Sequence, residues 1–345
     1  MKKRIILLAV FVLCVFQLAH AEKKIQVSLA PTIGHSFGET EYILKFRSYI
    51  LDEFGEIAVD DFGNPIIYEV KSLLEFPMDV IFIGGSILME PVLDKTLWSV
   101  ETGVYTTVND PGGAVTDSDW DSATSLWEET KFSYTESDAT MSSLRFNIEV
   151  TRRLLTLGKL RVSALGGFRY QNIKQDIYGY EGWYRILDTV NFVYSSETYT
   201  QSGSGPVGYY EVTYKQPQIG LLTSTEFPSG MTLKLKTAFT PVWFDDYDDH
   251  ILRNKESTAD GDGAGFEGSL RARFKFSSLR APLVPYLDIF ADYMTLHATG
   301  YQTQTWYGDD GATPDFDDTG LSVSNIYHEV NSTQYNIGFK LGLLF

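Results

Sequence analysis

Two acidic clusters contain residue types that could activate a water molecule. The first is Asp117-Ser118-Asp119-Trp120-Asp121, and the second is Asp245-Asp246-Tyr247-Asp248-Asp249-His250. A histidine held by a neighbouring aspartate can act as a general base near neutral pH, and two close carboxylates can share a proton and position a water. Such chemistry needs no serine or cysteine nucleophile. Taken singly, each cluster is more often turn chemistry or a solvated surface.

Composition limits the kind of protein that could carry these clusters. The chain has 345 residues, of which 43% are hydrophobic and 14% aromatic, with 29 Gly against 12 Pro. This length can bury a sizeable core, and the aromatic and glycine content favours many strands and turns over a helical bundle. The formal net charge of -17 gives little support to a nucleic-acid partner and suits cationic ligands better.

The first 21 residues predict a secretory signal peptide. Lys2, Lys3 and Arg4 precede the apolar run 5–16, and Ala19-His20-Ala21 has the small-x-small pattern of a cleavage site. Cleavage would leave residues 22–345 as one domain with 25 bases, 45 acids and a net charge of -20. Cys14, the only cysteine, would leave with the signal peptide, so the mature chain would hold no disulfide.

The remaining chain alternates apolar and polar residues in the manner of β-strands. In 335–345 the residues Tyr335, Ile337, Phe339, Leu341, Leu343 and Phe345 form one apolar face, and similar alternation recurs at 144–151, 160–168, 210–214, 233–239, 269–276 and 287–293. No run of about 18 apolar residues follows the signal peptide, so a transmembrane helix is not expected. The pattern predicts an all-β, antiparallel, transmembrane β-barrel of the bacterial outer membrane, with a soluble sandwich as the alternative.

Connection lengths predict the orientation of this barrel. Four short turns fall near Glu90-Pro91, 155–158, 226–230 and 277–282, and five long polar segments cover about 49–66, 109–140, 177–206, 245–262 and 299–328. Together they predict ten strands, with short periplasmic turns and long extracellular loops. The two acidic clusters then fall in the second and fourth loops, which face each other across the exterior mouth.

The residues of these clusters resemble the omptin family of ten-stranded outer-membrane endopeptidases. An Asp-x-Asp-Trp motif of that family is similar to 117–120, and its Asp-x-His motif is similar to 248–250. Segments 166–170 and 215–221 also resemble the family. The resemblance implies that Asp248 orients His250, and that His250 with Asp117 or Asp119 activates the attacking water. It implies no metal and no cofactor.

The same resemblance implies a preference for peptide bonds beside Arg or Lys. The acids of the S1 pocket would correspond to Glu41 and Asp246, and a weaker S1′ acid to Glu129. An acidic pocket pairs with cationic side chains, and the acidic chain would steer cationic peptides to the mouth. The alternative for Glu41 and Glu129 is ordinary solvation at the barrel rim. An extra turn at 60–65 departs from the family.

Lipid and assembly partners follow from the same resemblance. Omptins bind lipid A of lipopolysaccharide through basic residues of the outer wall; Lys174 corresponds to one of these, but Thr213 stands at another. A requirement for lipopolysaccharide or another outer-leaflet lipid is therefore left open. The aromatic carboxy terminus, Phe345, predicts recognition by the outer-membrane assembly machinery.

Two classes of function remain for the sequence. The first is an omptin-like, aspartic-type endopeptidase of the outer membrane, with its active site facing the exterior and peptides or proteins as substrates. The second is a non-catalytic outer-membrane barrel, such as an adhesin, a porin or a structural protein, whose acidic loops are a binding surface. The relative positions of the four predicted catalytic residues, Asp117, Asp119, Asp248 and His250, would discriminate between them.

Overall fold

The structure is a computed structural model that describes residues 25–49, 57, 59, 63–65, 67–91, 97–108, 113–123, 130–188, 193–276, 283–309, 311 and 317–345. The predicted signal peptide and Glu129 lie outside these residues. Within the described part of the chain, no helix is long and apolar enough to cross a membrane.

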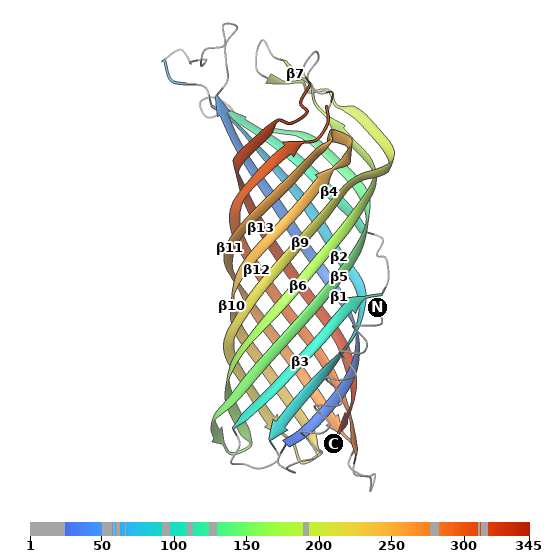
Figure 1. Cartoon of the computed structure of the whole chain (residues 1–345), viewed down its shortest axis with the longest axis vertical. Helices are drawn as coiled ribbons and strands as arrows, with labels where there is room; N and C mark the ends of the chain where they lie inside the picture. Colours follow the sequence, from blue (N-terminus) through green and yellow to red (C-terminus); the bar gives the residue numbers. More distant parts are fainter. Residues whose placement is uncertain are drawn as a thin grey trace.

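One antiparallel sheet closes into a barrel (Figure 1). Its strands are β1 (Ile25–Tyr49), β2 (Ile67–Pro91), β3 (Trp98–Thr107), β4 (Gly113–Ala123), β5 (Thr130–Leu157), β6 (Leu160–Tyr184), β9 (Tyr199–Glu226), β10 (Met231–His250), β11 (Lys255–Lys275), β12 (Val284–Trp306) and β13 (Ser322–Leu344). β1 pairs with both β2 and β13, which closes the ring and excludes the open sandwich. A separate two-stranded sheet joins β7 (Leu187–Asp188) to β8 (Val193–Tyr194).

The eleven strands of the closed sheet occupy ten positions around the ring. β3 and β4 share one position, because each pairs with a different part of both β2 and β5. β4 lies toward the upper end of the barrel and β3 toward the lower end (Figure 1). The predicted ten-stranded antiparallel barrel is confirmed.

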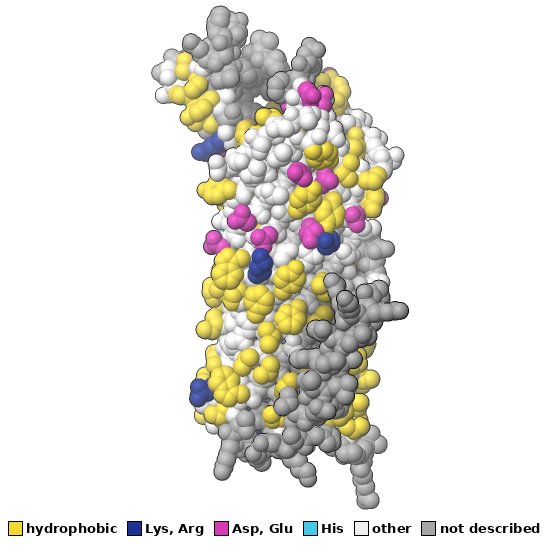
Figure 2. Space-filling model, viewed as in Figure 1, with side chains coloured by type: hydrophobic (Ala, Val, Ile, Leu, Met, Phe, Trp, Pro, Cys, Tyr) yellow, Lys and Arg dark blue, Asp and Glu magenta, His cyan; other side chains and the backbone are white. Residues whose placement is uncertain are grey.

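The outward side chains form an apolar belt around the lower half of the barrel. Along β13, Ile337, Phe339 and Leu341 are exposed, whereas the alternating Asn336 and Lys340 are buried inside. Figure 2 shows hydrophobic side chains over the lower half of the visible wall, with acidic side chains from mid-height upward and a basic side chain near the lower edge. This is the pattern of a wall that faces lipid below and water above, and every strand of the closed sheet has hydrogen-bonding neighbours on both sides. After β13, the Phe345 N–H donates to the Val27 carbonyl at 2.9 Å.

The prediction that the acidic clusters lie in long loops is wrong. Residues 113–123 form β4, and residues 231–250 form β10, which is followed by the single 3₁₀ turn η1 (Ile251–Arg253) before β11 starts at Lys255. These polar segments stay paired as strands because hydrogen-bonded ladders form equally well in a wall that stands in water. Strand geometry gives successive side chains opposite directions, so Asp246 and Asp248 are buried inside while Asp245 points outward.

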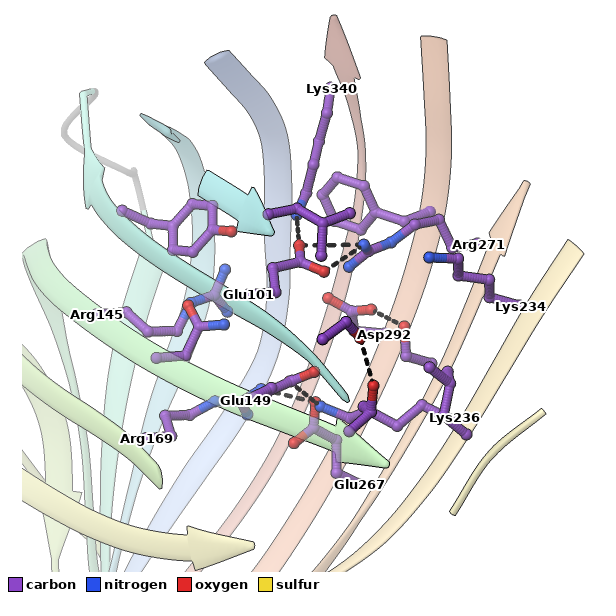
Figure 3. Close-up of a pocket in the computed structure, with 18 residues that line it drawn as sticks. Glu101, Arg145, Glu149, Arg169, Lys234, Lys236, Glu267, Arg271, Asp292 and Lys340 are labelled. Carbon is purple, nitrogen blue, oxygen red and sulfur yellow. Dashed lines mark hydrogen bonds and ion pairs between the residues drawn. The ribbon is translucent and has the colours of Figure 1, made fainter. Parts of the chain in front are cut away.

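Charged side chains fill the lower interior of the barrel. Glu267 lies 2.7 Å from both Arg169 and Lys236, and Glu101 lies 2.8 Å from both Arg271 and Lys340. Figure 3 shows these side chains converging from opposite walls. The cavity that remains among them is about 70 Å³, too small for a solute channel. Above this layer, an apolar cluster that includes Tyr42, Phe76, Tyr210, Tyr214 and Phe244 occupies the interior.

Candidate active site

Four of the predicted site residues line one cavity at the upper end of the barrel. Asp117 and Asp119 come from β4, and Asp248 and His250 come from β10, on another side of the ring. The cavity has a volume of about 720 Å³. The two clusters, well over a hundred residues apart in sequence, are therefore brought together by closure of the barrel.

His250 and Asp248 are within ion-pair distance of each other. His250 Nε2 lies 2.9 Å from Asp248 Oδ2, and the side chains are 25% and 6% exposed. His250 is the last residue of β10, where η1 begins and where the chain turns back through Asn254 with a left-handed φ of 45°. The buried carboxylate can orient the ring through one nitrogen, which leaves the other nitrogen for a water or a substrate.

Asp117 and Asp119 lie two residues apart on one strand, so both side chains face the cavity. Asp117 Oδ1 accepts from Ser72 Oγ at 3.3 Å, and Asp119 Oδ2 accepts from Ser133 Oγ at 2.5 Å. Burial, followed by the charge of Asp119, raises the pKa of Asp117 to about 7. A carboxyl group that exchanges a proton near neutral pH is suited to proton transfer.

Asp246 does not line this cavity. Its Oδ2 lies 2.7 Å from His328 Nε2, and the two side chains are 1% and 0% exposed. The Tyr42 ring packs on His328 with a centroid separation of 4.3 Å. Burial raises the pKa of the Asp246 carboxyl, and the hydrogen bond from His328 opposes that rise. The prediction that Asp246 is an accessible acid of an S1 pocket is therefore wrong, because His328 and Tyr42 enclose it.

Glu41 lies on the outer face of the wall, so its predicted place in an S1 pocket is also wrong. Its neighbours on β1, Thr40 and Tyr42, are the buried residues, and strand alternation turns Glu41 the other way. Glu41 Oε2 accepts from Asn331 Nδ2 at 3.2 Å across the β1–β13 pair. The predicted S1′ acid, Glu129, lies outside the described residues.

A second cavity adjoins the first and contains a residue that the sequence analysis missed. It has a volume of about 400 Å³ and shares Asp117, Asp119 and His250 with the first cavity. Lys255 lines it and is the direct cross-strand partner of His250 in the β10–β11 hairpin. Burial and the charge of Arg253 lower the pKa of Lys255 to about 8. Nothing in the local sequence marks Lys255 as different from a solvated rim lysine.

Metal and lipid requirements stay predictions. Among the residues that the structure describes, no three His, Cys, Asp or Glu side chains are grouped to hold a metal ion. Lys174, the predicted lipid contact, lies on the outer wall with its Nζ 2.8 Å from Glu211 Oε2. That carboxylate also accepts from Tyr209 Oη at 2.6 Å.

Comparison with known proteins identifies the fold. The sequence matches no known protein family and no curated protein. The structure is similar to the crystal structure of outer membrane protease OmpT from Escherichia coli, with a TM-score of 0.64 and 13% identity over 93% of this chain and 97% of that one. A TodX monoaromatic hydrocarbon channel mutant (TM-score 0.21, 8% identity, 94% and 91% covered) and vanillate-bound OpdK from Pseudomonas aeruginosa (TM-score 0.12, 8% identity, 93% and 99% covered) are too distant to bear on the fold. The chain therefore shares the barrel fold of an outer membrane protease.

Proposed function

We propose that the protein is an outer-membrane endopeptidase that hydrolyses peptide bonds with a water activated by His250 and by Asp117 or Asp119. One observation carries the proposal: His250, held by Asp248, faces a common cavity with Asp117, whose pKa is raised to about 7. The shared fold with an outer membrane protease supports it.

In the proposed reaction, a water lies between His250 and the Asp117–Asp119 pair. The free ring nitrogen of His250 takes one proton as the water oxygen bonds to the scissile carbonyl carbon. Asp248 stabilises the imidazolium that forms. The C–N bond then breaks, the leaving amine takes the proton from His250, and the new carboxylic acid releases its proton to solvent. Asp117 and Asp119 position the water by accepting hydrogen bonds from it.

The placement of the site supports an exterior location. The short connections at 158–159 and 227–230 lie at the opposite end of the barrel from the four site residues. Bacterial barrels put their short turns in the periplasm, which leaves the cavity facing outward. A cleft open to water at that end suits substrates that arrive from outside the cell.

Specificity for Arg or Lys has weaker support than the reaction itself. The net charge predicted for the mature chain favours cationic peptides, but Glu41 faces outward and Asp246 is buried against His328. Cleavage beside basic residues would then depend on Glu129 and on long-range steering.

A mixture of unmodified peptides covering all residue types tests the proposed reaction. The purified, lipid-reconstituted protein should cut it, and mass spectrometry would identify the new termini. The His250→Ala protein should leave the mixture intact. A wild type that produces no new termini would favour the non-catalytic barrel, and the filled lower interior already argues against its porin form.

A further inference from the structure

Outside the four site residues, the described charged lining of the two cavities is basic. Apart from Asp117, Asp119, Asp248 and His250, the charged side chains that line them, among the described residues, are Arg185, Arg253 and Lys255. Arg185 lies in the larger cavity, Lys255 in the smaller one, and Arg253 in both. These three bases would repel a cationic side chain placed beside them, because like charges in a partly dehydrated cleft repel.

Lys255 is buried without a carboxylate partner. The residue is 7% exposed, and its Nζ donates to Gln304 Oε1 at 3.3 Å. In the described part of the chain, no acidic oxygen lies within 4.0 Å of the Lys255 ammonium or the Arg253 guanidinium. A buried cation whose hydrogen-bond acceptor is neutral is costly. The lowered pKa of Lys255, about 8, has the same origin. The charges of Asp248, Asp117 and Asp119 offset part of that cost, and an anion in direct contact would offset more of it.

The walls around Lys255 are apolar. Trp306 is its cross-strand partner on β12, with the ammonium 5.6 Å from the ring centroid. Residues from other strands complete the pocket: Leu44, Val70, Val323 and Ile326. Such a pocket has room for a short aliphatic stem that ends in a negative charge.

We propose that this smaller cavity binds an acidic side chain, Asp or Glu, of the peptide substrate through Lys255 and Arg253. The inference rests on the proposed endopeptidase function and assigns its substrate class. His250 opposes Lys255 directly, so the bound acidic residue would lie close to the scissile bond. Asp117 would repel it little while it holds a proton, which its pKa of about 7 allows near neutral pH.

The test uses three peptides that are identical except for one Glu, Gln or Lys at the position mapped nearest to the cut. The wild type should cleave the Glu peptide at least ~10-fold faster than the Gln peptide in kcat/KM, since a desolvated charge pair contributes more than 1.4 kcal/mol. Lys255→Met should bring the two rates together, and Lys255→Glu should favour the Lys peptide. Lys215→Met is the matched control, because Lys215 pairs with Asp245 on the outer wall; it should keep the wild-type ratios.

The outcomes separate this pocket from the reaction. A wild type that prefers the Lys peptide, or a Lys255→Met protein with an unchanged Glu-to-Gln ratio, overturns the pocket and leaves the endopeptidase intact. A Lys255→Met protein that loses rate equally on all three peptides, with a shifted pH profile, would make Lys255 a counter-ion for the carboxylate pair and also overturns the pocket.

Binding measurements show whether the pocket exists even if the protein cleaves no peptide. Fluorescence anisotropy of the labelled peptides would be measured on the His250→Ala protein, which cannot turn them over. If no peptide is ever cleaved but the Glu peptide binds in a manner that Lys255→Met abolishes, the proposed reaction fails and the acidic pocket stands. Equal binding of all three peptides overturns the pocket.

Discussion

His328 Nε2 lies 2.7 Å from Asp246 Oδ2 inside the barrel, and neither side chain reaches solvent. The pair joins β13 to β10 beneath the layer that holds Asp248 and His250. The Tyr42 hydroxyl accepts a hydrogen bond from Gln302 next to this pair, and the Tyr42 ring covers His328. Asp246 therefore links two strands of the wall under the cleft.

Breaking this pair should destabilise the barrel. Asp246→Ala or His328→Ala should each lower the free energy of unfolding by about 3–5 kcal/mol, because each leaves one buried polar group without its partner. The double variant should lose less than the sum of the two singles. Urea unfolding of the detergent-folded protein, followed by tryptophan fluorescence, measures all three.

Asp245→Ala is the matched control for Asp246→Ala. Asp245 pairs with Lys215 on the outer wall, with side chains that are 56% and 47% exposed. Its loss should cost less than about 1 kcal/mol, because solvent screens an exposed pair. Equal losses of unfolding free energy in Asp245→Ala and Asp246→Ala would mean that the buried pair does not stabilise the wall.

The proposed reaction should depend on His250 and Asp117. His250→Ala or Asp117→Ala should lower kcat at least ~10²-fold. The first removes the group that takes the proton from the water, and the second removes a group that positions the water. His35→Ala is the control, since His35 pairs with Asp79 on the outer face, outside the cleft, and should retain full activity. Activity would be followed on a peptide that the wild type cuts, with circular dichroism as the check on folding. Unchanged turnover by His250→Ala would refute the assignment.

The proton on Asp117 should make stability depend on pH. Its pKa is raised from 3.8 to about 7 in the folded protein, so the folded state binds more protons than the unfolded state between these values. The stabilising contribution of Asp117 is complete below its unfolded pKa of 3.8 and is lost as the pH rises through its folded pKa of about 7. Asp117→Asn lacks this ionisation, so its stability relative to wild type should increase between about pH 4 and about pH 7 and change little above that range.

Replacing Asp119 tests the cause of that pKa. The charge of Asp119 follows burial as the second cause that raises the pKa of Asp117. Asp119→Asn should therefore lower the upper end of the pH window, whereas the lower end, set by the unfolded chain, should stay in place. Urea midpoints across the pH range would show the shift, and an identical window in Asp119→Asn would contradict coupling between the two carboxyls.

The interior ion pairs should contribute more to the unfolding free energy than the ion pairs on the surface. Glu267→Ala leaves Arg169 and Lys236 buried without their shared carboxylate and should cost about 3–5 kcal/mol of unfolding free energy. Glu226→Ala removes a pair with Arg161 whose side chains are 47% exposed, at 3.8 Å, and should cost less than about 1 kcal/mol. Equal unfolding midpoints for the two variants would argue against the interior network as a stabilising element.

The apolar belt predicts how the protein fractionates. Membranes from expressing cells should retain it after salt and alkaline washes, and detergent should release it, because the exposed side chains of the lower wall require a lipid-like environment. Immunoblots of the fractions measure this. Recovery in the aqueous periplasmic fraction without detergent would contradict the membrane barrel.

The sequence by itself determined the strands and their count. Alternation at 335–345 or 269–276 is a local property: one face of each strand must meet lipid or water and the other the interior, whatever its neighbours are. The order of strands around a ring also brought Asp117 and Asp119 to the side facing His250. Loop boundaries failed at 109–140 and 245–262 because a polar strand standing in water has the same composition as a loop.

Only the tertiary structure decided what each acidic residue contacts. Asp246 and Asp248 share one face of β10, yet Asp246 is paired with His328, 82 residues away in sequence, and Asp248 with His250. Glu41 faces outward because of its register on β1. Lys255 is a candidate binding residue because it lies opposite His250 and because other strands supply the walls of its cavity. These relationships depend on register and closure among distant strands, which no local pattern of residues encodes.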